Sequence, residues 1–358
     1  MSDASPESAT TFVERFSRKI ARNRVPLSGT MDLTHRCNLS CPHCYLGQGT
    51  ARTAGCGSEW DTAAWTGIID AMADHGCLFL LISGGEPLLR PDFADIYRHA
   101  KTRGLVITVF TNGTRLHDNL FDLFSQWPPH QIEISLYGAS RETYARTTGH
   151  PEAFDAVMQG LDGLRRWGLR FDLKTVLTRD TLPDLDAMSA MAQGFDADFR
   201  FDPALFCDFH GGRAPIDLRV APETAVALEF ADAQIRDKWV TYYRQMKDAP
   251  AIDRLYPCGA GLTNFYIDPY GRMKPCLLVD GPMADLGEIP FDRAWNQIIA
   301  TIRSLAAGPD FVCKTCDKRI VCGLCPAFFR LENQSAQVPA AYLCAIGHYR
   351  LKAIRDAL

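Results

Sequence analysis

The stretch LTHRCNLSCPHCYLGQG, residues 33–49, places three cysteines within a single short segment. They follow the spacing C-x3-C-x2-C, at Cys37, Cys41 and Cys44. Three thiolates on one tight loop can hold three irons of a [4Fe–4S] cluster and leave the fourth iron open for a ligand. A structural zinc site takes four protein ligands, which His35 or His43 could complete, so zinc remains the alternative.

The composition of the whole chain indicates what kind of protein contains this segment. The 358 residues carry a net charge of −4, which gives no sign of a nucleic-acid partner. No apolar run is long enough for a membrane helix, and the N-terminus lacks a secretory signal, so we expect a cytoplasmic protein. The thirteen cysteines, odd in number, therefore indicate metal ligation rather than disulfides. Seven of them form a second block, at Cys258, Cys276, Cys313, Cys316, Cys322, Cys325 and Cys344.

Around the first cysteines, short apolar runs alternate with helix-like stretches. Six runs are expected to be strands, at 30–33, 77–82, 105–110, 131–136, 171–177 and 198–201. They are apolar enough to be parallel strands buried on both faces. Helices are expected over 58–75, with Ser58 as N-cap and Asp61 three positions later, and over 152–167. The pattern predicts an α/β fold, a partial (β/α)6 TIM-like barrel with its chemistry at the carboxyl ends of the strands.

The cysteine segment resembles the signature of the radical S-adenosylmethionine (SAM) enzymes. The motif SGGEP, residues 83–87, closes the second expected strand and is similar to the GGE motif of that family. The resemblance implies that the open iron binds the amino and carboxylate groups of SAM, and that an electron from the cluster cleaves SAM to a 5′-deoxyadenosyl radical. It also implies that backbone groups at Gly84 and Gly85 and the Glu86 carboxylate accept hydrogen bonds from the SAM ammonium.

Further SAM contacts are implied at other strand ends. FTNGT and EISLYG end the third and fourth expected strands, and LKTVLT lies on the fifth. The resemblance places Ser135 at the ribose of SAM, Lys174 at its carboxylate and Tyr45 near its adenine, with Asn112 as a further contact. Asn112-Gly113 is also a common turn dipeptide, and Lys174 could be a plain surface charge.

The second cysteine block resembles the SPASM domain, a C-terminal extension of radical SAM enzymes that act on peptides and proteins. The resemblance implies two auxiliary [4Fe–4S] clusters, a distal one on Cys313, Cys316, Cys322 and Cys344, and a nearer one on Cys258, Cys276 and Cys325. The nearer cluster is one cysteine short, so its fourth site could be open, or filled by another side chain or by substrate. Cys322 and Cys325 are separated by two residues where the usual pattern has three, which leaves their assignment to the two clusters open. A single auxiliary cluster and a zinc site are the alternatives.

The domain organisation is expected to follow these two blocks. It comprises an N-terminal extension (1–29), the barrel (30–221), a helical linker (222–255) with one helix over 222–247, and the auxiliary-cluster domain (256–358). After the sixth expected strand, Cys207, Asp208 and His210 lie where substrate should bind and are the candidate catalytic residues.

Three functions compete on this evidence. The first is a peptide maturase that installs an oxidative cross-link or a similar modification in a ribosomally made precursor. The second is an enzyme of small-molecule or cofactor biosynthesis, and the third is an iron–sulfur carrier or zinc-stapled protein, which would have no use for the GGE motif. Sulfatase maturation is disfavoured because those relatives usually carry an aspartate where this chain has Leu277. The expected partners are a peptide or small-protein substrate, an electron donor such as flavodoxin or ferredoxin, and a separate protein that could deliver the peptide.

Overall fold

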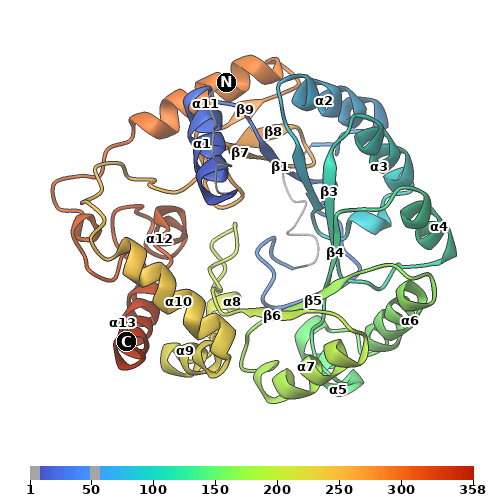
Figure 1. Cartoon of the computed structure of the whole chain (residues 1–358). Helices are drawn as coiled ribbons and strands as arrows, with labels where there is room; N and C mark the ends of the chain where they lie inside the picture. Colours follow the sequence, from blue (N-terminus) through green and yellow to red (C-terminus); the bar gives the residue numbers. More distant parts are fainter. Residues whose placement is uncertain (1–8, 49–56) are drawn as a thin grey trace, which may run out of the picture.

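The computed structural model describes residues 9–48 and 57–358. Its core is a nine-stranded sheet with the strand order β6-β5-β4-β3-β2-β1-β7-β8-β9 (Figure 1). The first six strands are parallel, and each pairs with the next in sequence. Their bounds are β1 Ser28–Asp32, β2 Phe79–Ser83, β3 Val106–Thr111, β4 Gln131–Ser135, β5 Asp172–Val176 and β6 Phe199–Asp202. The six predicted strands are thereby confirmed, to within about two residues at each end.

One expectation about these strands was wrong, because they are not buried on both faces. In β3, Ile107 and Val109 are fully buried, whereas Val106, Thr108 and Phe110 are half-buried. Successive side chains of a strand point to opposite faces, so one face of the sheet packs on helices and the other faces the partly open barrel interior.

Helices cover the outer face of the curved sheet (Figure 1). Those between the parallel strands are α2 Thr62–Asp74, α3 Phe93–Thr102, α4 Asp118–Gln126, α5 Arg141–Thr148, α6 Ala153–Arg166 and α7 Leu185–Gly194, with 3₁₀ turns at Pro87–Leu89 and Leu182–Asp184. Helix α2 begins later than expected. Its N-cap is Asp61, whose Oδ1 accepts from the Ala64 amide at 2.9 Å, and not Ser58. The reason is tertiary: the Trp60 amide donates to the Pro269 carbonyl at 2.8 Å and holds the preceding residues extended.

The expected helix over 222–247 is two helices, α9 Pro222–Ala231 and α10 Ala233–Met246. Asp232 breaks it, since its extended backbone lets Oδ1 accept from the amides of Gln234 and Ile235 and cap α10. Before them, α1 Ala9–Arg22 precedes β1, and α8 Ala214–Asp217 is a single turn after β6.

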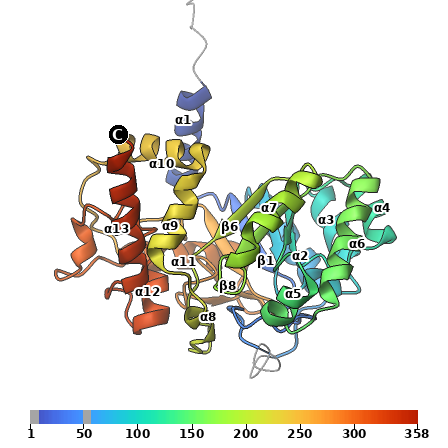
Figure 2. The same cartoon turned by 90° about the horizontal axis from the view of Figure 1, so that it is seen from below.

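The C-terminal part begins by extending the barrel sheet. Strand β7 Asn264–Ile267 is parallel to β1, and β8 Arg272–Lys274 and β9 Ala284–Asp285 continue antiparallel. The remaining elements are α11 Phe291–Ser304, a 3₁₀ turn at Val312–Lys314, α12 Pro326–Asn333 and α13 Ala341–Asp356. Figure 2 shows α9, α10, α12 and α13 gathered on one side of the barrel. Within that group α13 packs along α9, where Arg350 holds Glu229 through two bonds of 2.7 and 2.6 Å. No helix in the described ranges is both long and apolar enough to span a bilayer.

Candidate functional site

A cavity of about 310 Å³ opens at the carboxyl ends of the barrel strands. All three cysteines of the first block line it, together with residues from β1 to β5 and their following loops. Of the predicted SAM contacts, the cavity walls include Tyr45, Gly84, Gly85, Asn112, Ser135 and Lys174. The fold therefore brings these six residues to the three cysteines, although they lie up to 137 positions away from them in the sequence.

The two glycines of the SGGEP motif lie against the backbone of the cysteine loop. A Cβ on Gly84 would stand 2.3 Å from the Thr34 carbonyl oxygen, and one on Gly85 would stand 2.3 Å from that of Arg36. Gly84 also has φ +136°, which side-chain-bearing residues rarely adopt. The Gly85 amide donates to the Thr34 carbonyl at 2.7 Å, so both glycines are needed to join β2 to the loop.

Glu86 lies under the cavity and is not among the residues that line it. The side chain is fully buried, and its carboxylate accepts from the Leu88 amide (3.0 Å), the Thr111 hydroxyl (2.8 Å) and the Asn112 amide (2.7 Å). Burial raises the pKa of Glu86 to about 7, against the lowering effect of these three donors. In this arrangement Glu86 ties the β2 and β3 loops together.

Asn112 connects the hydrogen bonds of Glu86 to the cysteine loop. Its Nδ2 donates to Asn38 Oδ1 at 3.0 Å and lies 3.7 Å from Cys37 Sγ. Asn38 in turn donates to the Thr114 hydroxyl at 2.8 Å. The turn after β3 therefore holds the first cysteine in place.

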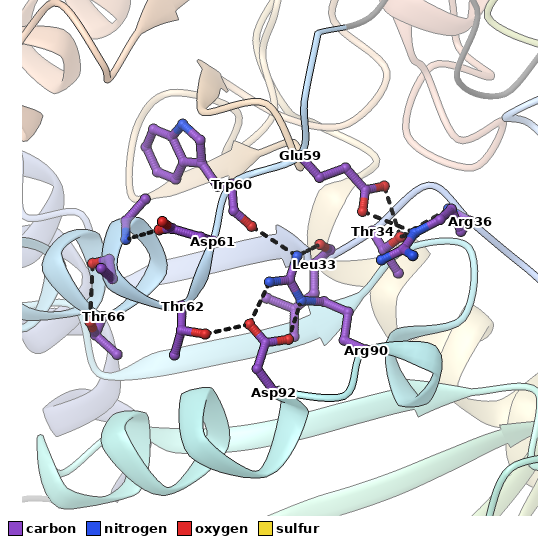
Figure 3. Close-up of polar contacts among 12 residues, drawn as sticks. Leu33, Thr34, Arg36, Glu59, Trp60, Asp61, Thr62, Thr66, Arg90 and Asp92 are labelled. Atoms are coloured by element: carbon purple, nitrogen blue, oxygen red, sulfur yellow. Dashed lines mark hydrogen bonds and ion pairs between the residues drawn. The ribbon is translucent and has the colours of Figure 1, made fainter.

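A second polar network holds the start of the cysteine loop (Figure 3). Glu59 Oε1 accepts from the Thr34 hydroxyl at 2.8 Å and from the His35 amide at 2.9 Å, and Oε2 faces Arg36 Nε at 3.2 Å. Beside it, the buried Arg90 guanidinium donates to the Leu33 and Trp60 carbonyls, each at 3.0 Å.

Asp92 orients that guanidinium through two bonds of 2.9 and 2.6 Å, and itself accepts from the Thr62 hydroxyl at 2.6 Å. The end of β1, the loop after β2 and the start of α2 are thus fastened to one another (Figure 3). Such bidentate arginine–carboxylate pairs add geometric precision as well as energy.

At the end of β1, Asp32 lines the cavity with a carboxylate that is 1% exposed. Its Oδ2 accepts from the Tyr266 hydroxyl at 2.8 Å and is 3.8 Å from His35 Nε2, and the Tyr45 hydroxyl also bonds to the carboxylate. Burial raises the pKa of Asp32 to about 7, although both tyrosines lower it. The pairing of Thr30 with Tyr266 across β1 and β7 brings these groups together.

On the opposite wall, Lys174 lies in the cavity and is not an exposed surface charge. Its Nζ is 3.3 Å from Glu133 Oε2 and lies over the Phe110 ring, and Arg200 pairs with the same Glu133 carboxylate. Burial lowers the pKa of Lys174 to about 7, which Glu133 opposes. Ser135 is next to Lys174 in register, and its hydroxyl bonds to the Tyr137 side chain.

The three candidate catalytic residues do not line this cavity. Cys207 is buried, His210 is exposed, and Asp208 Oδ1 accepts from the amides of His210 (2.9 Å) and Gly212 (2.8 Å). The loop reaches the site through Phe209, whose amide donates to the Tyr45 carbonyl at 2.9 Å and whose ring lies 5.3 Å from that of Tyr45.

The C-terminal cysteines fall into two neighbourhoods. Burial raises the pKa of Cys325 to about 11, and the nearby thiols of Cys276 and Cys258 raise it further. Burial also raises the pKa of Cys322 to about 12, reinforced by the other thiols of its neighbourhood, Cys313, Cys344 and Cys316. The structure therefore brings together three thiols in one group and four in the other, the same division that the SPASM resemblance implies. Cys313 belongs to a buried apolar cluster that includes Phe311, Phe328 and Phe329, and Cys276 and Cys325 pack against it.

The geometry of these thiols bears on zinc. Among residues 9–48 and 57–358, no three His, Cys, Asp or Glu side chains converge closely enough to hold a single ion. The three groups of cysteines remain the residues that could hold iron–sulfur clusters, as the family resemblance implies. Burial also lowers the pKa of His43 to about 4, so its ring is neutral beside the first group.

The sequence prediction gave no role in SAM binding to several residues in the walls of the cavity, among them Asp32, Tyr137 and Leu277. Asp32 could have been found, because it is the last residue of a strand whose carboxyl end carries the site. Leu277 could not, since only the pairing of β7 with β1 brings the loop after Cys276 to the cavity.

Comparison with known proteins agrees with this geometry. Residues 31–191 match the model of the Radical SAM superfamily. Over these residues the chain carries a radical SAM domain, and its relatives support an enzyme of the radical SAM class. That class works with a [4Fe–4S] cluster and SAM, and the three thiols, the close-packed glycines and the cavity beside them fit both groups.

Two relatives show how far the likeness extends. The PqqA peptide cyclase of Xanthomonas euvesicatoria pv. vesicatoria is 28% identical over 311 residues, which cover 82% of this chain and 81% of the relative. The AdoMet-dependent heme synthase of Methanosarcina barkeri is 30% identical over 178 residues, half of each chain.

Solved structures share the fold over nearly the whole chain. Streptococcus suis SuiB bound to S-adenosylmethionine has a TM-score of 0.68 at 16% identity, and covers 96% of this radical SAM chain and 82% of its own. SuiB bound to the precursor peptide SuiA has a TM-score of 0.66 at 15% identity, with coverage of 96% and 83%. The expected radical SAM barrel with a cysteine-rich C-terminal region is confirmed by this likeness.

Proposed function

We propose that this radical SAM enzyme modifies a ribosomally made peptide, most simply by an oxidative cross-link. The observation that carries the proposal is that the C-terminal cysteine region is built onto the barrel sheet and reaches the cavity through Leu277. The match to a peptide cyclase extends over 82% of the chain, more than the barrel alone, whereas the match to the heme synthase is confined to half of it. The alternative, small-molecule or cofactor biosynthesis, is supported by that shorter match alone.

In the proposed site, Cys37, Cys41 and Cys44 hold the catalytic cluster. When bound, the cluster and SAM supply a reductive cleavage that generates a 5′-deoxyadenosyl radical. Gly84 and Gly85 let the β2 loop approach the cysteine loop closely, and Asn112 fixes Cys37. Lys174 would face the carboxylate of SAM and Ser135 its ribose, and Tyr45 would lie near the adenine.

Glu86 is proposed to act through the backbone. Because its carboxylate is already bonded to two amides and a hydroxyl, it orders the loop ends that form the cavity floor. Cys207, Asp208 and His210 would act at the mouth of the barrel, where the bonds of Asp208 shape the loop that carries Phe209 to Tyr45.

The four-thiol and three-thiol groups are proposed to hold two auxiliary [4Fe–4S] clusters in a domain spanning residues 256–358. A cross-link that removes two hydrogens leaves the product two electrons more oxidised than the substrate. One hydrogen is removed as an atom and the other leaves as a proton and an electron, so the proton passes to solvent and the electron needs an acceptor. Two clusters held by these C-terminal thiols could accept it. A peptide or small protein, an electron donor such as flavodoxin or ferredoxin, and a separate protein that delivers the peptide complete the proposed partners, in the cytoplasm.

The test combines iron analysis, SAM turnover and peptide mass. Anaerobic reconstitution should give about twelve irons per chain and no stoichiometric zinc, and reduction with SAM should release 5′-deoxyadenosine. Co-expression with each short reading frame beside the gene should yield one peptide lighter by two hydrogens. About four irons would refute the auxiliary clusters. Unmodified peptides from every frame, with 5′-deoxyadenosine still formed, would favour the small-molecule alternative.

A further inference from the structure

Asp32 has no role in the proposed contacts with SAM described so far. It is nevertheless the only carboxylate among the described residues that line the cavity, just as Lys174 is the only lysine or arginine. Its burial makes an isolated negative charge costly unless a partner offsets it. Lys274 is near enough to lower its pKa, but the Lys274 ammonium itself donates to the Leu277 carbonyl at 3.1 Å.

SAM differs from most cellular adenosine compounds by its sulfonium, a permanent cation that cannot donate a hydrogen bond. A protein can favour such a cation by a fixed negative charge in a dry site, where charge–charge interaction is much stronger than in water. Asp32 has the required features, since it is 1% exposed and lines the same cavity as the three cysteines. Two tyrosine hydroxyls, those of Tyr45 and Tyr266, hold its orientation.

We infer that Asp32 is the counter-charge for the sulfonium of SAM, and that it makes the cavity prefer SAM over uncharged analogues. This rests on SAM occupying the cavity, and it does not depend on which substrate is modified. In addition to the cysteines and glycines, the site would then have a residue that selects SAM, with its charged sulfonium, over analogues that lack this charge.

The reagent that isolates this role is S-adenosylhomocysteine, which keeps the amino, carboxylate, ribose and adenine groups but has a neutral thioether. Dissociation constants of both compounds would be measured by calorimetry on the anaerobically reconstituted protein. Asp32→Asn should lower the preference for SAM over S-adenosylhomocysteine by about tenfold. Equal weakening of both compounds would instead place Asp32 at the amino group, and an unchanged ratio would also overturn the inference.

Asp268→Asn provides the matched control. Asp268 is a buried carboxylate near Asp32 that bonds to Arg272 at 2.6 Å and does not line the cavity, so its loss should leave the ratio within about twofold. A loss as large as that of Asp32→Asn would mean that the general field of the site, and not Asp32, sets the preference.

A second measurement covers the case in which Asp32→Asn fails to load iron. Burial raises the pKa of Asp32 to about 7, so the wild-type carboxylate should be neutral at pH 6 and charged at pH 8.5. The groups that face it are Tyr45, Tyr266, His35, Asp268 and Lys274. The preference for SAM should therefore rise between these pH values, and a flat ratio would contradict the proposal. Because no peptide is used, failure here is distinct from failure of the proposed maturase function.

Discussion

The barrel cavity and the C-terminal cysteine region present thiols in two different ways. In the cavity, three cysteines come from one short loop, and two polar networks and a pair of glycines hold that loop to strands β1 to β3. In the C-terminal region, seven cysteines come from loops and helix ends spread between Cys258 and Cys344. The difference predicts that the cysteine loop of the cavity keeps its form without a bound group, whereas thiols spread along irregular backbone depend far more on any group that they bind.

The sharpest test of this comparison replaces the cysteines themselves. Changing Cys37, Cys41 and Cys44 to Ala should reduce reductive SAM cleavage to background, because no other thiol group lines the cavity among the described residues. Changing Cys313 and Cys316 to Ala should leave measurable cleavage while removing iron. The measurement is 5′-deoxyadenosine released under dithionite. Intact release from the triple variant would refute the assignment of the cavity.

The next largest effect is expected at Gly85. In Gly85→Ala the new Cβ would clash with the Arg36 carbonyl, separating the β2 loop from the cysteine loop. We expect unfolding free energy to fall by about 3 kcal/mol and the iron of the first site to be lost. Gly67→Ala is the control, since Gly67 lies in α2 with open space around its Cα and should gain stability. Equal effects of the two substitutions, by thermal unfolding and iron analysis, would show that the close approach is unimportant.

Arg90 tests whether the network in Figure 3 acts on the cluster loop. Arg90→Lys keeps the charge but cannot bind Asp92 at two points and also reach the Leu33 and Trp60 carbonyls. A loss of about 2 kcal/mol and an altered electron paramagnetic resonance spectrum of the SAM-binding cluster are expected. Arg98→Lys, at the exposed pair with Asp95, should cost less than about 0.5 kcal/mol. An unchanged spectrum in Arg90→Lys would show that the network contributes to the stability of the fold and does not affect the cluster.

The smallest effect should arise in the C-terminal region, at Gly347 on α13. A Cβ there would stand 2.5 Å from Cys322 Cβ, one helical turn from Cys344. Gly347→Ala should cost about 1 to 2 kcal/mol and about four irons, while 5′-deoxyadenosine is still formed. Gly194→Ala, which meets open space, should keep all the iron. Full iron content in Gly347→Ala would show that the four-thiol group tolerates displacement of Cys322.

The sequence by itself determined the barrel and most of its site. Short apolar runs ending in cysteine, glycine or polar motifs define both the strands and their carboxyl ends, because parallel strands place those ends on one edge. That is why Gly84, Asn112, Ser135 and Lys174 could be expected together. The division of the C-terminal cysteines into two groups came from the resemblance to the SPASM domain, which left the assignment of Cys322 and Cys325 open.

The tertiary structure decided what depends on contacts between distant segments. The pairing of β7 with β1 extends the barrel sheet, brings Tyr266 to Asp32 and Leu277 to the cavity, and the contact of Trp60 with Pro269 moves the start of α2 to Asp61. Burial also decided the surroundings of Glu86, since two of its three hydrogen-bond donors, Thr111 and Asn112, lie at the end of another strand. Local patterns carry periodicity and motifs, but the charge balance of a buried site arises only when strands far apart in the chain become neighbours.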